Sequence, residues 1–294
     1  MVPSRPSWSA PNFLEFTFAA LRGDDKMAGT FSQLHNVFKL RIGFAIMLTA
    51  LAGLAMTPNA DLSLFEVTSL ALAVLVSAAA AGALNQYLER DLDGAMARTA
   101  NRPFVTGFYK PGPKWVIAIT LLLAGAVILA WSVLNFATAL YVFLGAFFYG
   151  VVYTVWLKRR TPQNIVIGGA SGAFPPMIGW TAVSGDISLD SVLLFAIIFM
   201  WTPPHFWALA LYRSGDYEKA GVPMLPVVSG ARETKKQILI YSILLVPLTL
   251  APVFTGMAGA IYGTAAVLLG IGLMRHSIRV WRMDDRNEDP ASKA

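Results

Sequence analysis

The sequence predicts an all-α fold, a polytopic membrane helical bundle with about eight spans. Hydrophobic residues make up 56% of the chain and charged residues only 14%, whereas roughly a quarter of an ordinary soluble domain is charged. Several apolar stretches approach or exceed the roughly 20 residues that a helix needs to cross about 30 Å of hydrocarbon. Basic residues gather between these stretches on one side, which is typical of loops that stay in the cytoplasm.

Eight helical spans follow from the apolar stretches, taken in chain order. Their expected ranges are 39–58, 64–88, 114–133, 136–156, 164–183, 190–211, 237–255 and 258–275. Residues 1–35 lack a long apolar core that ends in a small-residue cleavage site, so they are expected to form a cytoplasmic leader. Residues 36–282 are then the transmembrane domain, and residues 283–294 are a polar C-terminal tail.

The placement of the charges fixes the expected topology. With eight spans, all 23 lysines and arginines fall on one face. The only charged residues in or next to the short turns on the opposite face are acidic. Basic loops stay in the cytoplasm, so both termini are expected there. The net charge of +6 is therefore read as topology, and no nucleic-acid partner is expected. Because the chain contains no cysteine, thiolate nucleophiles, disulfides and cysteine-held metals are excluded.

Two of the inner loops are long, near 89–113 and 212–236. An even number of spans separates them, so the two halves of the chain are expected to be related as parallel repeats. A polar loop would then leave the membrane at the same place in each half. We expect the two loops to face each other across a central cavity.

The first long loop opens with a polar stripe. Asn85, Glu89 and Asp93 are spaced at i, i+4 and i+8, so they point the same way if the helix continues this far. Two carboxylates and an amide oxygen in such a row can hold Mg²⁺, which shares its coordination with a substrate's phosphates. Asp91 points elsewhere. The alternative is a solvated helix end whose side chains reach the lipid headgroups.

The second long loop combines acid and base. Tyr212 and Asp216 are again four residues apart, and Arg213 and Lys219 add positive charge beside them. Such a mixture suits a metal-bound diphosphate, with the carboxylate on the metal and the cations on the phosphate oxygens. The alternative is a loop whose charges pair with one another and with lipid headgroups.

Two proline pairs interrupt the later spans. His205 directly follows the pair Pro203-Pro204 and lies about two turns before the end of its span. An ionisable residue at membrane depth is a functional candidate, and the alternative is a neutral histidine held by a loosened backbone carbonyl. Small residues surround the other pair, Pro175-Pro176, and favour close helix packing. This pair is also expected to bend its span and to open a cavity for a long apolar substrate.

Four segments carry a resemblance that covers the chain from about residue 39 to residue 282. They are Asn85 to Pro103, Lys158 to Trp180, Pro203 to Leu211 and Asp216 to Val228. Together they resemble the heme-farnesylating branch of the UbiA-type intramembrane prenyltransferase superfamily. The resemblance implies that the farnesyl group of farnesyl diphosphate is joined to a vinyl group of protoheme IX (heme B), giving heme O and diphosphate. It also implies Mg²⁺, a UbiA-type fold of nine spans around a central cavity, and the bacterial cytoplasmic (inner) membrane.

The resemblance also assigns roles by position. The catalytic and metal-holding residues that it implies are Asn85, Glu89, Asp93 and Asp216. The expected substrate-binding residues are Arg98, Arg102, Lys158, His205, Tyr212, Arg213 and Lys219. Two departures stand out: the superfamily usually has Asp where this chain has Glu89, and its ninth span should follow Arg282. Either the sequence is truncated before that span or this member lacks it.

Two other functions stay open at this point. One is a prenyltransferase that acts on a quinone precursor or chlorophyllide, against which the Pro-Pro-His-Phe-Trp stretch argues. The other is a secondary transporter with parallel halves, but transporters place their ionisable residues near the midplane, whereas these carboxylates crowd one face. The expected partners are farnesyl diphosphate, protoheme IX, the lipid bilayer and a downstream heme A synthase.

Overall fold

A computed structural model of the chain describes residues 29–283, and every regular element within them is a helix. The all-α prediction is therefore confirmed. The helices are α2 (Thr30–Val37), α3 (Leu40–Met56), α4 (Leu64–Leu88), α5 (Arg90–Ala95), α6 (Pro113–Val133), α7 (Phe136–Phe147), the π-helix η1 (Phe148–Leu157), α8 (Asn164–Gly168), α9 (Ala170–Ser184), α10 (Leu189–Tyr212), α11 (Ser214–Lys219), α12 (Leu225–Phe254) and α13 (Ala260–Arg282).

Each predicted span corresponds to one of these helices or to a pair that follows directly in the chain. Six helical segments are individually long and apolar enough to cross a membrane, and a seventh is added if α2 and α3, bent by 55°, count as one span. The predicted span 164–183 is divided between α8 and α9. The chain is thus a multi-pass membrane protein. The expected leader is partly helical, because α2 begins at Thr30, while residues 1–28 and the tail 284–294 lie outside the described residues.

Local sequence signals start the helices at the end of the bundle that carries the short turns. At α4 the Ser63 hydroxyl accepts from the Glu66 amide at 3.3 Å, and the Glu66 carboxylate accepts from the Ser63 amide at 2.7 Å. Ser188 and Ser191 make the same reciprocal pair at α10. These capping boxes satisfy amides that a helix start leaves unbonded. Gly185, with a φ of 72°, ends α9 in the left-handed conformation that glycine adopts without strain.

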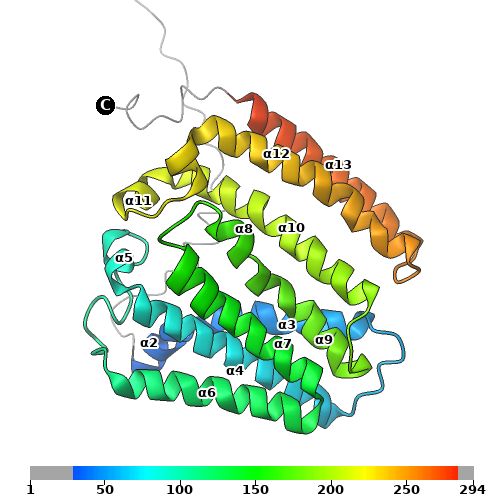
Figure 1. Cartoon of the computed structure of the whole chain (residues 1–294), viewed down its shortest axis with the longest axis horizontal. Coiled ribbons are helices and arrows are strands. Elements are labelled where there is room, and N and C mark those ends of the chain that lie inside the picture. The colour runs from blue at the N-terminus through cyan, green and yellow to red at the C-terminus, as the bar shows by residue number, and fades with distance from the viewer. Residues whose placement is uncertain (1–28, 284–294) are drawn as a thin grey trace, which may run out of the picture.

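The helices form one continuous bundle (Figure 1). α3 packs against α4 and α9, and α9 also packs against α7 and α10. α12 lies between α10 and α13, so α13 stands at the rim of the bundle. The short helices α5 and α11 lie at the end opposite to the short turns. That end carries both long loops.

Glycines explain the close approach of α3 and α9. A Cβ added to Gly179 would lie 1.8 Å from the Ala50 carbonyl oxygen, and one added to Gly53 would lie 2.2 Å from the Pro176 carbonyl oxygen. Residues 173–182 of α9 are buried throughout. The small residues therefore serve packing, as one interpretation predicted. Pro176 lies against Gly53 of α3, and the opening expected beside Pro175-Pro176 for a long apolar substrate stays a prediction.

Candidate functional site at the loop end of the bundle

The polar stripe of the first loop forms although the helix is interrupted. α4 ends at Leu88, and Glu89 has a φ of −99° and a ψ of 20° before α5 begins. The Glu89 amide still donates to the Asn85 carbonyl at 3.0 Å, and the Asp93 amide donates to the Glu89 carbonyl at 2.8 Å. The four-residue spacing thus survives the break. Asn85, Glu89 and Asp93 are 2%, 2% and 1% exposed, so they are not a solvated helix end.

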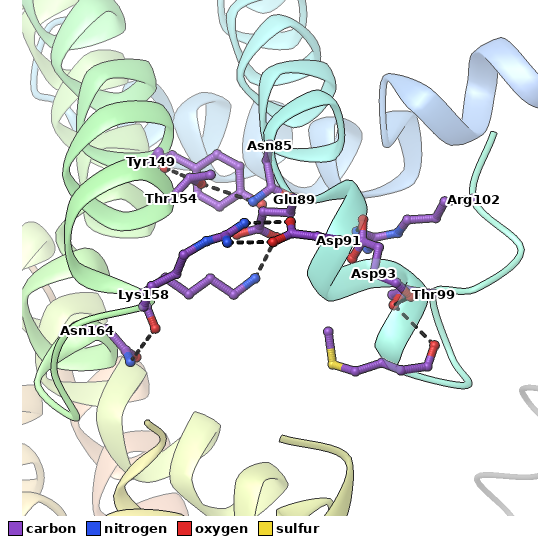
Figure 2. A network of polar contacts seen from close by, with 12 residues as sticks. Asn85, Glu89, Asp91, Asp93, Thr99, Arg102, Tyr149, Thr154, Lys158 and Asn164 are labelled. Carbon is purple, nitrogen blue, oxygen red and sulfur yellow. Dashed lines mark hydrogen bonds and ion pairs between the residues drawn. The ribbon is translucent and has the colours of Figure 1, made fainter. Parts of the chain in front are cut away.

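Each carboxylate of the stripe faces a cation, Glu89 one that is distant in the chain and Asp93 one from the same loop (Figure 2). Lys158 Nζ lies 2.5 Å from Glu89 Oε2, and Arg102 Nη1 lies 2.6 Å from Asp93 Oδ2. The exposed fractions of these side chains are 11% for Lys158 and 21% for Arg102. Buried charges of this kind persist only when they are paired. The structure therefore brings four of the predicted site residues into two contacts.

Asn85, the third member of the stripe, contacts Lys39, a basic residue that the sequence indicated only as part of the cytoplasmic charge. Lys39 Nζ donates to Asn85 Oδ1 at 2.6 Å and to the Tyr149 hydroxyl at 3.1 Å. Lys39 lies in the break between α2 and α3 with a φ of 48°, and the Gly82 position of α4 leaves room for it. A non-glycine residue in this conformation is uncommon and often marks a functional site. The unusual backbone is invisible in the sequence.

A π-helical segment delivers Lys158 to the site. In η1 the Thr154 hydroxyl donates to the Tyr149 carbonyl five residues earlier, at 2.8 Å, and accepts from Asn85 Nδ2 at 3.0 Å. π-turns are rare and occur frequently at functional sites. After η1, the fully buried Asn164 donates to the Lys158 carbonyl at 3.5 Å (Figure 2). It also donates to the Thr161 carbonyl at 2.7 Å, within the turn that follows Lys158.

The donors of the stripe fit a hard cation. Glu89 Oε1 is buried and, within residues 29–283, has no hydrogen-bond partner, which is costly unless a ligand satisfies it. Asn85, Glu89 and Asp93 all offer oxygen donors, the type of ligand that Mg²⁺ prefers. No three histidine, aspartate or glutamate side chains of the described residues already form a metal-binding group. The stripe alone thus offers two carboxylates and one amide.

Asp91 behaves differently from its neighbours. It is bound by both terminal nitrogens of Arg159, at 2.6 and 2.7 Å, and its side chain is 61% exposed. These hydrogen bonds lower the pKa of the Asp91 carboxyl to about 2. The expectation that Asp91 points away from the stripe is confirmed. The surface ion pair that it forms belongs to the outer edge of the site.

The two long loops are in contact with each other. Leu92 of α5 and Met96, which follows α5, share an apolar cluster with Ala210, Val222 and Met224, which flank α11. The central cavity expected between the loops stays a prediction. The polar residues of the second loop are less enclosed than those of the first. Those placed here by the sequence are Tyr212, which is 86% exposed, Arg213 and Asp216, which are half-buried, and Lys219, which is exposed. No contact in the described structure links Asp216 or Tyr212 to the stripe, so their roles stay predictions.

His205 and Arg98 are also exposed. The His205 ring stacks on Trp201 with a centroid separation of 5.5 Å and meets Phe206 edge-on at 5.3 Å. The alternative in which a backbone carbonyl holds this ring is wrong, because the imidazole makes no hydrogen bond to any described residue. Its expected contact with a substrate stays a prediction.

The chain matches a family model described as the UbiA prenyltransferase family over residues 46–294. It is 50% identical over 266 residues to a protein of Parvibaculum lavamentivorans named protoheme IX farnesyltransferase, covering 90% of this chain and 83% of that one. It is 48% identical over 264 residues to a protein of the same name from Azorhizobium caulinodans, covering 90% and 84%.

Solved structures show the same fold at low sequence identity. A digeranylgeranylglyceryl phosphate synthase matches with a TM-score of 0.74 and 17% identity, over 90% of this chain and 91% of that one. A UbiA homologue from Archaeoglobus fulgidus, bound to DMAPP and Mg²⁺, matches with a TM-score of 0.70 and 17% identity, over 88% and 92%.

Proposed function

Because this chain belongs to the UbiA prenyltransferase family, we propose that it joins the farnesyl group of farnesyl diphosphate to a vinyl group of protoheme IX, producing heme O and diphosphate. Its curated relatives, named protoheme IX farnesyltransferase, cover 90% of its length at 48% and 50% identity. We also propose that it acts in the bacterial inner membrane with its basic loop end, and both termini, in the cytoplasm. Heme A synthase is the proposed recipient of the product.

The observation that carries the proposal is the buried stripe at the loop end. Asn85, Glu89 and Asp93 each meet one basic side chain, those of Lys39, Lys158 and Arg102 in that order. A basic group beside each oxygen donor favours an anion such as a diphosphate at this place. The residues proposed to hold Mg²⁺ are Asn85, Glu89, Asp93 and Asp216. The transporter alternative fits less well, because these groups lie at the loop end of the bundle.

In the reaction, the bond between farnesyl C1 and the diphosphate oxygen breaks, and its electron pair leaves with the diphosphate. Mg²⁺, when bound, would neutralise the charge that develops on this leaving group. Lys158 and Arg102 are the nearest cations proposed to take the phosphate oxygens, and Arg98, Arg213 and Lys219 are proposed to assist from the loop rims. Lys158 and Arg102 would each exchange a carboxylate partner for a phosphate oxygen.

The vinyl carbon then bonds to farnesyl C1, and addition of water with loss of a proton discharges the positive charge left beside the macrocycle. Until the new carbon–carbon bond has formed, the allylic fragment must be kept from water. The aromatic cluster in which Phe174 contacts Phe148 at 5.4 Å and Phe195 at 5.2 Å is proposed to form part of that dry wall. We propose that His205 and Tyr212 contact the heme or the prenyl chain from α10.

The test is product analysis in purified vesicles that hold the chain, farnesyl diphosphate, heme and Mg²⁺. A farnesylated heme detected by mass spectrometry, with diphosphate release that depends on heme, is the expected result. Asp93→Ala should abolish both while the protein stays in the membrane. Normal turnover by this variant would refute the metal-site assignment. A prenylated product that contains no iron porphyrin would refute heme as the substrate.

A further inference from the structure

The rim helix α13 carries a basic face that has no acidic partner among residues 29–283. Arg275, Arg279 and Arg282 recur at i, i+4 and i+7, so they lie on one side of the helix. With Ile278 and Met283 they line a depression of about 620 Å³. None of the three guanidinium groups forms an ion pair with any residue between 29 and 283. The site described above uses none of them.

Helix electrostatics account for only part of this arrangement. Cations are favoured in the last turn of a helix, where Arg279 and Arg282 lie. Arg275 lies two turns before the end, and like charges at i, i+4 repel each other. A second depression, between α12 and α13, differs in this respect: Glu233 there accepts from Lys236 at 3.4 Å and from Gln237 at 2.8 Å. Within the described part of the chain, no carboxylate compensates the arginine face in this way.

The same side of α13 continues as an apolar surface. Leu268 and Ile271, 65% and 53% exposed, stand seven and four residues before Arg275, on the same side of the helix. Leu268 therefore lies about 10 Å deeper in the membrane than Arg275. Trp281, 41% exposed, lies beside the basic end, at the depth where tryptophan meets lipid headgroups. This side of α13 therefore has an apolar surface deeper in the membrane and guanidinium groups at the headgroup level, which matches an amphiphile with an anionic headgroup.

We propose that this face of α13 binds an anionic phospholipid of the adjacent leaflet, with its phosphate held by Arg275, Arg279 and Arg282 and its acyl chains along Leu268 and Ile271. Charge decides the occupant. A second copy of the chain docked by the same face would bring six guanidinium groups together, whereas a phospholipid phosphate complements three of them. The proposal is independent of the reaction catalysed.

The test is native mass spectrometry of the purified chain in detergent with equimolar phosphatidylglycerol and phosphatidylcholine. Each guanidinium should favour the anionic lipid roughly fivefold, and three should favour it on the order of a hundredfold. Arg275→Gln/Arg279→Gln/Arg282→Gln should lose this preference, and the matching triple lysine variant should keep most of it. The control Arg41→Gln/Lys110→Gln/Lys114→Gln removes three exposed charges elsewhere and should behave as wild type.

Raising the NaCl concentration to 0.5 M should release phosphatidylglycerol from the wild-type chain, so the test stands even if a variant fails to fold. Equal retention of both lipids by the wild type would overturn the proposal, and so would an unchanged preference in the triple glutamine variant. The proposal would also be overturned if the wild type showed no preference for phosphatidylglycerol and the variant Asp284→Asn/Asp285→Asn did. In that case the carboxylates of Asp284 and Asp285, which lie outside the described residues, would be the groups that occupy the arginine face.

Discussion

Glu89→Gln separates the structural role of the buried ion pair from its proposed metal-binding role. Glu89 is 2% exposed and Lys158 11% exposed, with 2.5 Å between their charged atoms. Removing one charge of a buried pair costs about 3–5 kcal/mol, because it leaves the other charge uncompensated. We expect about 3 kcal/mol here, since the amide oxygen of glutamine still accepts one hydrogen bond. Lys158→Met should cost at least as much.

The double variant Glu89→Gln/Lys158→Met decides between the two roles. Because both charges are gone, its stability should return to within about 1 kcal/mol of wild type, which corresponds to a coupling of about 5 kcal/mol. Its activity should not return. Loss of one electrostatic stabiliser lowers kcat by about 10²–10³-fold, and the restored stability does not replace the oxygen ligand.

The assay pairs thermal unfolding in detergent with mass spectrometry of farnesylated heme. Glu89→Asp is the matched control, since it keeps the charge and is the residue usual in the superfamily. It should lose roughly tenfold in rate, because a ligand displaced by about 1 Å costs at most around a hundredfold. Full activity in the double variant would refute the metal-site assignment. Wild-type stability in Glu89→Gln alone would refute the buried-pair argument.

Three further outcomes are expected. Gly179→Ala should lower the free energy of unfolding by about 1–3 kcal/mol, because its Cβ would lie 1.8 Å from the Ala50 carbonyl oxygen; Gly172→Ala, with nothing within 4 Å, should be neutral in the same detergent melt. Asp91→Asn should leave product formation at pH 7 unchanged and stability within about 1 kcal/mol, since its pair with Arg159 is exposed. Because the pKa of Asp91 is lowered to about 2, the contribution of the Asp91–Arg159 pair to the free energy of unfolding is complete above about pH 4 and is lost as the pH falls toward 2. This would be contradicted if the unfolding free energies of the wild type and Asp91→Asn changed with pH at different slopes near neutral pH. Treatment with EDTA should stop product formation and added Mg²⁺ should restore it, whereas turnover that survives complete chelation would count against a metal site.

Much of the site follows from local spacing. The i, i+4, i+8 pattern of Asn85, Glu89 and Asp93 placed them on one side of a helix, and the structure keeps that register through the break at Glu89. Helical periodicity is a property of neighbouring residues, so it is readable from the chain. The same spacing at Tyr212 and Asp216 gives no contact with the stripe among the described residues, and Tyr212 is 86% exposed. Four residues of separation fix a common side of a helix, but they do not say what that side faces.

The partners of the stripe could not be predicted in this way. Lys39 meets Asn85 across 46 residues, and Lys158 meets Glu89 across 69. Both contacts depend on irregular backbone, a left-handed residue at Lys39 and a π-helical turn before Lys158. Such conformations are locally unfavourable and persist only where the surrounding structure holds them.

The sequence by itself determined that this is a membrane protein, where its helices run and which end carries the polar loops. Hydrophobic length and basic loops report these properties because the cost of burying charge in hydrocarbon applies residue by residue. Only the tertiary structure decided that Glu89 and Asp93 are buried in ion pairs while Asp91, between them in the chain, pairs at the surface. Burial depends on which helices pack beside a residue, and that packing joins segments that are distant in the chain.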